Sequence, residues 1–252
     1  MKPSISIIIT AMNEQINLEP TVKMVLEVVR PRFDDYELLI INDGSHDKTG
    51  EIAEALVASD PLHIRAHHNE VNMGLDYSYR KGVELAGKKY VGWVAGNNLN
   101  PRQGLEDTFD AVGQADIVLP YVVSDVRPWG RRLTSRMVVM LLNLLFGLKL
   151  KYYTGPCIYR SEDIKQVKIS SQGSIALAEI LIRLTRAGHS YVEVGLNTIK
   201  RTNGKSKTFR LKNFVQFGLA IARLFWEIRI LSSFKRRLGY SDAGMETDQA
   251  FG

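Results

Sequence analysis

Short apolar runs and longer amphipathic segments alternate along the first 120 residues. The first run, 4–10, is continuous and β-branched, which is typical of a strand covered on both faces. The segment that follows it has apolar residues at helical spacing. Such alternation predicts βαβ units and a mostly parallel α/β sheet. The predicted strands are 4–10, 37–41, 62–66, 90–94 and 116–119, and the predicted helices are 15–29, 48–58, 75–86 and 102–112.

The second half of the chain has a different pattern. Residues 126–151 have cations at both ends and an uncharged run of 12 residues, 137–148, between them. This run is shorter than the roughly 18–20 residues of a membrane span, so it predicts either a helix in the membrane interface or a buried core helix. A helix over 173–188, a strand over 191–194 and an apolar helix over 214–231 are predicted after it.

Polar residues follow the predicted strands where each one ends. Asn13-Glu14 comes after the first strand and Asn42-Asp43-Gly44-Ser45 after the second. Asn72-Met73-Gly74 and Gly96-Asn97-Asn98 come after the third and fourth. Because ligands bind at the carboxyl ends of strands in open α/β sheets, we expect the four turns to line one cleft. The Asp43 carboxylate could accept hydrogen bonds from a nucleobase or ribose, or it could only cap the next helix.

The charge balance favours anionic partners. The 252-residue chain has a net charge of +6 and a pI of about 9.3, which fits phosphates, nucleic acid or an acidic membrane surface. Nucleic acid is disfavoured because the basic stretches lack interleaved aromatic residues and any binding-module motif. The single cysteine, Cys157, excludes an internal disulfide and a cysteine metal cluster, and fits a reduced cytoplasmic setting. The N-terminal residues lead directly into a strand, so no signal peptide is predicted.

Two groups of cations are candidates for binding phosphate. The first precedes the apolar run and contains Arg131, Arg132 and Arg136. The second surrounds a Gly-Lys-Ser turn and contains Arg201, Lys205 and Lys207. This second group is either a phosphate clamp or a solvated basic loop. It is not a P-loop, because the upstream glycine at the required spacing is absent.

In this order the motifs resemble those of family 2 glycosyltransferases with the GT-A fold. Within that family they most resemble the polyprenyl-phosphate sugar synthases of the dolichyl-phosphate mannose synthase type, over about residues 3–235. One signature joins the strand and Asn-Glu turn of residues 4–14 to residues 42–49, which are similar to the family's Asp-Gly-Ser-x-Asp-x-Thr. The others are Asn72-x-Gly74 with Arg80 and Gly82, and Arg201-x-x-Gly204-x-Ser206-Lys207 after a helix that bears Glu179.

The resemblance implies a GT-A, Rossmann-like fold and an inverting glycosyltransferase of cell-envelope glycan synthesis. The donor would be a nucleotide sugar and the acceptor is expected to be polyprenyl phosphate. Residues 1–120 would bind the donor, 121–208 would form the acceptor-binding and catalytic half, and 209–238 would form amphipathic helices before a disordered tail, 239–252. We expect peripheral contact with the cytoplasmic membrane face. A polar stripe on the last helix, Gln216, Arg223 and Glu227, would suit membrane docking or packing in a homo-oligomer.

The resemblance also implies roles for individual residues. The implied donor-binding residues are Ala11, Asn13, Glu14, Asp43, Gly74, Gly96, Asn97 and Asn98. Arg131, with Arg132 or Arg136, would meet the acceptor phosphate, and Arg201, Lys205 and Lys207 would face phosphates. A lipid phosphate is already anionic, whereas a hydroxyl acceptor would need a general base, for which Glu179 and Asp125 are the candidates. Glu179 also lies one helical turn from Arg183, so a structural ion pair is the alternative.

The chain departs from the family pattern where a metal is usually held. The family's Asp-x-Asp corresponds to Gly96-Asn97-Asn98, and amides are poor ligands for a hard cation compared with carboxylates. Asn42 replaces a frequent acidic residue, and a tyrosine of Tyr152-Tyr153-Thr154-Gly155 replaces an aspartate. Mg²⁺ or Mn²⁺ is therefore not a certain cofactor. Either the basic groups neutralise the diphosphate instead, or the protein is a non-catalytic nucleotide-binding or membrane scaffold.

Overall fold

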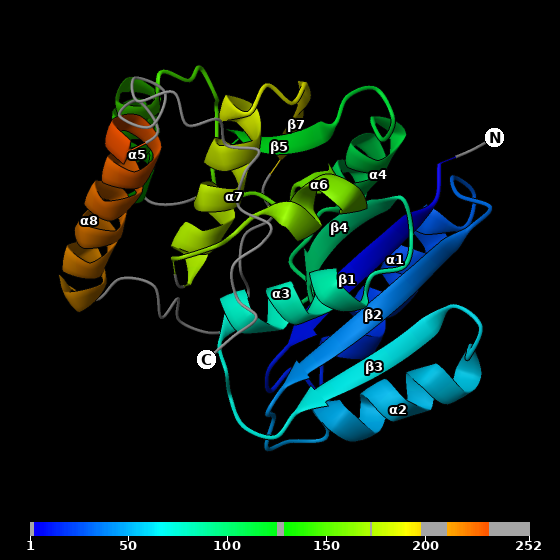
Figure 1. The fold of residues 1–252 in the computed structure, drawn as a ribbon. Coiled ribbons are helices and arrows are strands. Elements are labelled where there is room, and N and C mark those ends of the chain that lie inside the picture. The colour runs from blue at the N-terminus through cyan, green and yellow to red at the C-terminus, as the bar shows by residue number, and fades with distance from the viewer. Residues whose placement is uncertain (1–2, 125–128, 172, 198–210, 232–252) are drawn as a thin grey trace, which may run out of the picture.

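The protein is described by a computed structural model that covers residues 3–124, 129–171, 173–197 and 211–231. These residues form one seven-stranded sheet between two layers of helices (Figure 1). The strands are β1 (Ile5–Ala11), β2 (Tyr36–Asp43), β3 (Ile64–Asn69), β4 (Tyr90–Ala95), β5 (Ile117–Ser124), β6 (Ile158–Arg160) and β7 (Tyr191–Asn197). The helices are α1 (Leu18–Val29), α2 (Thr49–Ser59), α3 (Leu75–Leu85), α4 (Arg102–Asp110), α5 (Trp129–Phe146), α6 (Ser161–Gln166), α7 (Ser174–Arg186), α8 (Leu211–Phe225) and the π-helical η1 (Trp226–Leu231).

The strand order is β3-β2-β1-β4-β6-β5-β7. β6 is antiparallel to both of its neighbours, and every other neighbouring pair is parallel. All strands except β6 therefore point the same way, and their carboxyl ends share one edge. This topology confirms the predicted mostly parallel α/β sheet.

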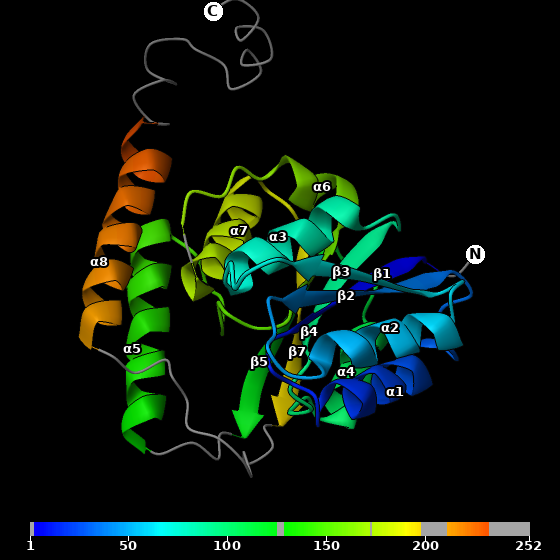
Figure 2. The same cartoon turned by 90° about the horizontal axis from the view of Figure 1, so that it is seen from below.

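The central strands are apolar on both faces because helices cover both. Ile7 and Ile9 pack with α1, α2 and α4, while Ile8 packs with the helices of the opposite layer. Figures 1 and 2 show α1, α2 and α4 on one side of the sheet and α3, α6 and α7 on the other. The continuous β-branched runs of the sequence are explained by this double cover.

The sequence predicted most elements to within a few residues and missed two. β6 has three residues and α6 has six, so neither is long enough to give a periodic pattern. The first helix begins at Leu18 instead of residue 15, and the Gln15 N–H before it donates to Asp47 (3.2 Å) in the turn after β2.

Helix α5 has one buried and one exposed apolar side. Leu142 and Phe146 are buried, and the Phe146 ring meets Phe225 of α8 edge-on at 6.3 Å. Figures 1 and 2 both show α5 and α8 side by side at the end of the molecule away from β3. The opposite side of α5 leaves these large apolar side chains exposed: Trp129, Leu133, Met137, Met140, Leu141 and Leu144. Within the described ranges, no helix is long and apolar enough to cross a membrane.

Candidate active site

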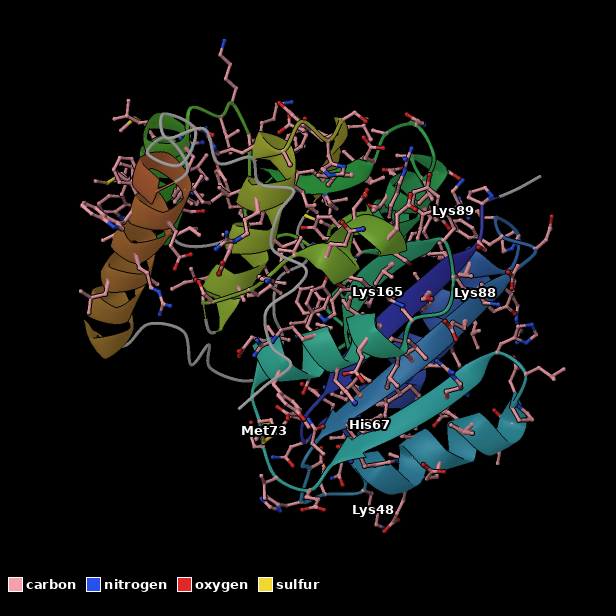
Figure 3. The ribbon with its side chains drawn as sticks, in the orientation of Figure 1. Lys48, His67, Met73, Lys88, Lys89 and Lys165 are labelled. Carbon is pink, nitrogen blue, oxygen red and sulfur yellow. The ribbon has the colours of Figure 1, made fainter. Side chains whose placement is uncertain are left out.

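The turns that the sequence singled out lie along one edge of the sheet. Ala11 at the end of β1 is paired with Asn42, and Asp43 is paired with Asn69 at the end of β3. Figure 3 places Met73 beside the carboxyl ends of β2 and β3, whereas Lys88 and Lys89 lie toward the amino-terminal edge. The fold thus brings the predicted donor-binding turns together.

Asp43 is buried and holds the loop before α3. Its Oδ1 accepts hydrogen bonds from Asn69 Nδ2 and the Met73 N–H (both 2.9 Å), and its Oδ2 accepts one from the Gly74 N–H (3.0 Å). Gly44 makes this close approach possible: its φ is +63°, and a Cβ there would lie 2.3 Å from the carbonyl carbon of Val71. Asp43 therefore fixes the loop at residues 72–74.

The alternative role considered for Asp43, a cap for the next helix, belongs to Asp47. Its Oδ1 accepts the Thr49 N–H (2.9 Å) at the start of α2. Burial alone would raise the pKa of Asp47, but hydrogen bonds from Thr49 and Gln15 outweigh it and hold the pKa below its ordinary value.

The turn after β1 is tied to the turn after β2. Asn13 has a φ of +55°, donates its N–H to Ser45 Oγ (3.0 Å) and accepts the His46 N–H on Oδ1 (2.9 Å). The Glu14 N–H donates to Thr49 Oγ1 (2.8 Å). Two of the predicted donor-binding residues are thus held by the same turn that contains Asp43.

Asn42 uses both ends of its amide. Nδ2 donates to His68 Nδ1 (2.9 Å) and Oδ1 accepts the Ser45 N–H (3.3 Å). An aspartate would lack the donor that meets the imidazole. The amide at this position therefore has a definite partner that the sequence did not predict.

The turn after β4 is held by one internal hydrogen bond and one hydrogen bond to α1. Asn97 Oδ1 accepts the Leu99 N–H (3.2 Å), and the Asn98 N–H donates to Thr21 Oγ1 (3.0 Å). Asn98 has a left-handed φ of +53°. Among the described residues, no group of three or more His, Cys, Asp or Glu side chains is placed to hold a metal ion.

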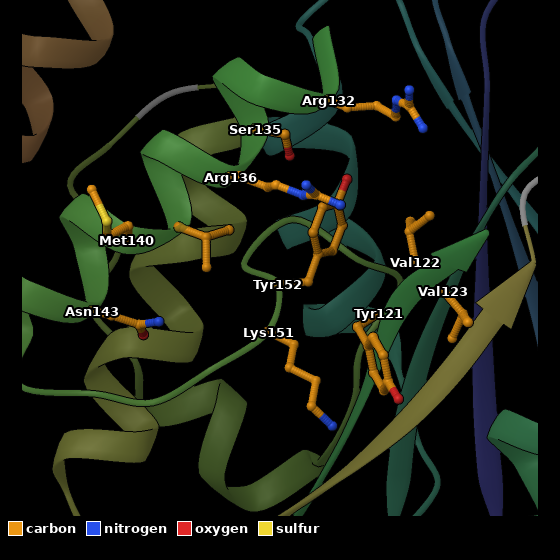
Figure 4. A pocket seen from close by; sticks show the side chains of 11 residues that line it. Tyr121, Val122, Val123, Arg132, Ser135, Arg136, Met140, Asn143, Lys151 and Tyr152 are labelled. Atoms are coloured by element: carbon orange, nitrogen blue, oxygen red, sulfur yellow. The ribbon is translucent and has the colours of Figure 1, made fainter. Parts of the chain in front are cut away.

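A cavity of about 520 Å³ lies between the carboxyl-terminal part of β5 and one face of α5. Arg132 and Arg136, two of the three predicted acceptor-phosphate residues, line it together with Lys151. Figure 4 shows Arg136 directed toward Tyr152, with Lys151 beside Tyr121. The side chain of Arg131 lies outside the described residues. The cavity is thus lined by three cations, two of which come from one face of α5.

Lys151 makes three contacts with two residues, Glu193 and Tyr121. Its backbone N–H donates to Glu193 Oε1 (2.8 Å), and its Nζ lies 3.2 Å from Glu193 Oε2 and 4.3 Å from the Tyr121 ring centroid. The hydrogen bond to Glu193 raises the pKa of Lys151 above its ordinary value. The ammonium is therefore retained in a fixed position at the edge of the cavity.

Lys151 and its partners were not identified from the sequence as site residues. Gly147 is the sequence feature that indicates where the chain turns back, because a glycine after an apolar helical run commonly ends a helix. The helix does end at Phe146, and Gly147 takes a φ of +66°. The chain then returns so that Lys151 can meet β7.

The contacts of Glu179 are those of a structural ion pair with Arg183, the alternative to a general base. Its carboxylate is fully buried and accepts hydrogen bonds from the N–H groups of Ser170 and Ser171 and from Arg183 (2.8 Å to Nε). Burial would raise its pKa, but hydrogen bonds from Ser171, Arg183 and Ser170 outweigh it, and the pKa lies below its ordinary value. Such a carboxylate is a poor acceptor for a substrate proton. The remaining predicted catalytic residues, Arg201, Lys205 and Lys207, and the alternative base Asp125 lie outside the described residues.

A mostly parallel α/β sheet with polar turns at its carboxyl edge and a cation-lined cavity near it is the arrangement expected for a GT-A fold. The profile of Glycosyl transferase family 2 matches residues 6–165. Since this match covers more than half of the chain, the protein belongs to family 2 of the glycosyltransferases.

Similar proteins include enzymes that act on lipid phosphates. A polyprenol monophosphomannose synthase of Mycolicibacterium smegmatis is 28% identical over 80% of this chain and 79% of its own length. An undecaprenyl-phosphate mannosyltransferase of Micrococcus luteus is 27% identical over 71% of this chain and 78% of its own. Glycosyltransferase AglD of Haloferax volcanii is 24% identical over 93% of this chain, which spans only 39% of that protein.

The solved structures support the same fold. Glucosyl-3-phosphoglycerate synthase of Mycobacterium tuberculosis, in complex with Mn²⁺, UDP and phosphoglyceric acid, matches with a TM-score of 0.63 and 17% identity. The match covers 96% of this chain and 81% of that one. At this identity the likeness establishes the fold and not the substrates. The chain is thus a GT-A glycosyltransferase that resembles polyprenyl-phosphate mannose synthases.

Proposed function

We propose that this glycosyltransferase moves a sugar from a nucleotide diphosphate donor to polyprenyl phosphate, with inversion at the anomeric carbon. The nucleoside would lie over the carboxyl ends of β1 and β2. The acceptor phosphate would lie in the cavity beside Arg132 and Arg136. These positions share one edge of the sheet, as a transfer between two bound substrates requires.

The observation that carries the proposal is the shape of the acceptor side. Met140 lines the cavity and is also 68% exposed on the apolar side of α5. A cationic cavity that continues into an exposed apolar surface suits a phosphate attached to a long apolar chain. A soluble phosphorylated acceptor would use the cations and leave the apolar surface without a role.

The chemistry follows from the charge of the acceptor. A phosphate monoester oxygen attacks the anomeric carbon, the bond between that carbon and the donor diphosphate breaks, and the nucleoside diphosphate leaves with the bonding electrons. No general base is needed because the attacking oxygen already carries the charge. This agrees with the full hydrogen-bond set of Glu179, to which we assign a structural role.

The test is to incubate purified protein with UDP-sugars and GDP-sugars and one of two acceptors. Polyprenyl phosphate in detergent is compared with 3-phosphoglycerate. We expect lipid-linked sugar from the first acceptor and no product from the second. Turnover of the soluble acceptor alone would contradict the lipid assignment.

A second candidate function is a nucleotide-binding scaffold without turnover. The turn at Gly96-Asn97-Asn98 favours it, because no carboxylate is present there. Thermal unfolding with nucleotide, combined with analysis of products, distinguishes the two. A scaffold that binds nucleotide would be stabilised by UDP or GDP and would form no product with either acceptor.

A further inference from the structure

The turn after β4 does not suit the divalent cation that similar structures contain. Mn²⁺ accompanies UDP in the glucosyl-3-phosphoglycerate synthase structures. Here the side chains available are two amides, whereas hard cations select carboxylates. One of the amide oxygens, Asn97 Oδ1, is already used by the Leu99 N–H. The donor set is therefore weak in charge and partly occupied by the turn itself.

The backbone also opposes a carboxylate at the first position of this turn. A Cβ on Gly96 would lie 3.0 Å from the Thr10 carbonyl oxygen and 3.2 Å from the Ala11 Cβ. The Gly96 N–H donates to that same carbonyl at 2.9 Å, so the two segments cannot separate without losing a sheet hydrogen bond. The packing of β1 against this turn thus favours glycine, and the residues present do not fit a divalent metal.

A fixed cation lies on the same edge of the sheet, two strands away. Val91 and Ile117 are both paired with Tyr159 of β6. Ala95 and Tyr121, each four residues further along its strand, are therefore level. Two strand spacings separate them by about 10 Å. The Lys151 Nζ lies over the ring of Tyr121, 4.3 Å from its centroid.

The Lys151 ammonium remains available to a ligand. Its side chain is 54% exposed. The ammonium has three N–H donors and is paired with one carboxylate, that of Glu193, so donors remain for a ligand. Glu193 is kept in place by the backbone N–H of Lys151 as well, so it need not move when a phosphate binds. A cation that is held before the substrate arrives stabilises developing phosphate charge without reorganisation.

We propose that the donor diphosphate is bound without a divalent metal and that Lys151, held by Glu193 against Tyr121, contacts it directly. The inference rests on the proposed function, since it assumes a nucleotide diphosphate donor at the carboxyl edge. Lys151 then supplies a positive charge at the departing diphosphate.

Binding of UDP and of GDP, measured by titration calorimetry, tests the inference without turnover. The full chain is titrated in buffer with EDTA and again with MnCl₂. We expect one of the two nucleotides to bind in EDTA and Mn²⁺ to change its Kd by less than about twofold. Lys151→Gln should weaken that binding at least tenfold. Lys89→Gln is the matched control, because Lys89 also lies over a tyrosine ring, at 5.9 Å, but at the opposite edge of the sheet.

The outcomes separate the inference from the proposed function. Binding only in Mn²⁺, or equal binding by wild type and Lys151→Gln, overturns the inference and leaves a nucleotide-dependent glycosyltransferase. Binding of neither nucleotide in either buffer overturns both. Circular dichroism of Lys151→Gln confirms that any loss of binding is not a loss of fold.

Discussion

Asp43 decides how the donor side of the site is built. Its carboxylate receives three hydrogen bonds from the loop at residues 69–74, two on Oδ1 and one on Oδ2. Any contact with a nucleotide would use the capacity that remains on Oδ2, because a carboxylate offers about four lone-pair sites. The residue therefore shapes the pocket before it binds anything.

We predict that Asp43→Asn loosens this loop. The amide presents an N–H group to donors that the carboxylate accepted, so at least one of the three hydrogen bonds is lost. The expected loss of unfolding free energy is about 1–3 kcal/mol, and nucleotide binding should weaken as well. Urea unfolding and calorimetry with UDP and GDP measure the two effects. Asp110→Asn removes an exposed surface pair with Arg32 and should change neither by much. Unchanged stability of Asp43→Asn would contradict the role given to the carboxylate.

Arg136 gives a second prediction at the level of single residues. It lines the cavity, and no carboxylate is placed against it among the described side chains. Arg136→Gln should raise the KM for polyprenyl phosphate about tenfold, because a charge-assisted hydrogen bond to phosphate is lost. The KM for the nucleotide sugar should not change. An equal rise in both constants would place Arg136 on the donor side instead.

Elements long enough to show a periodic pattern were predictable from the sequence, whereas the contacts between them were not. The buried runs and amphipathic segments gave β1 to β5 and the helices α1 to α4, since each spans enough residues to show its period. β6 is too short for that, and its antiparallel pairing depends on two other strands. The polar turns were predicted to lie along one edge of the sheet, and they do. Lys151 was not singled out from the sequence because its position in the structure depends on a contact with Glu193, 42 residues away.

The helices α7 and η1 are joined by a partly buried charge network that gives a pH prediction. Arg183 lies 2.7 Å from Glu179 and 2.8 Å from Glu227 of η1. The folded pKa of Glu179 lies below its ordinary value. Its stabilising effect is therefore complete above the pKa of the unfolded chain and is lost as the pH falls through the folded pKa.

Glu179→Gln tests this network. The variant should unfold more easily by about 1–3 kcal/mol at pH 7, because the Ser170 and Ser171 N–H groups and Arg183 lose a charged acceptor. The difference from wild type should shrink as the pH is lowered below the ordinary range of glutamate. Urea unfolding at several pH values measures it. A kcat with polyprenyl phosphate that stays within a few-fold of wild type would agree with the structural role, whereas a loss of several orders of magnitude in a folded variant would favour a general base.

At the scale of the whole molecule, the cavity proposed to bind the acceptor and the exposed side of α5 lie on the same end of the protein. Met137 and Leu144 are 58% and 78% exposed on this helix, and Leu219 and Trp226 are exposed on α8 and η1. Exposed apolar area of this extent is costly unless another surface covers it. A bilayer that contains the lipid acceptor would cover it and would bring the phosphate to Arg132 and Arg136. We therefore expect the protein to bind membranes through α5.

Met137→Glu combined with Leu144→Glu tests this docking. Each substitution removes apolar burial in the bilayer and adds a charge that anionic headgroups repel, so binding to vesicles with anionic lipid should fall at least about tenfold. Leu62→Glu is the control, because Leu62 is 88% exposed but lies in the α2–β3 connection. Vesicle flotation measures binding, and turnover of a short-chain polyprenyl phosphate in detergent should survive, since the cavity itself is unchanged. If the double variant still floats with the vesicles, the apolar side of α5 does not dock on the membrane. A change from an oligomer to a monomer would then assign this side to contacts between copies of the chain.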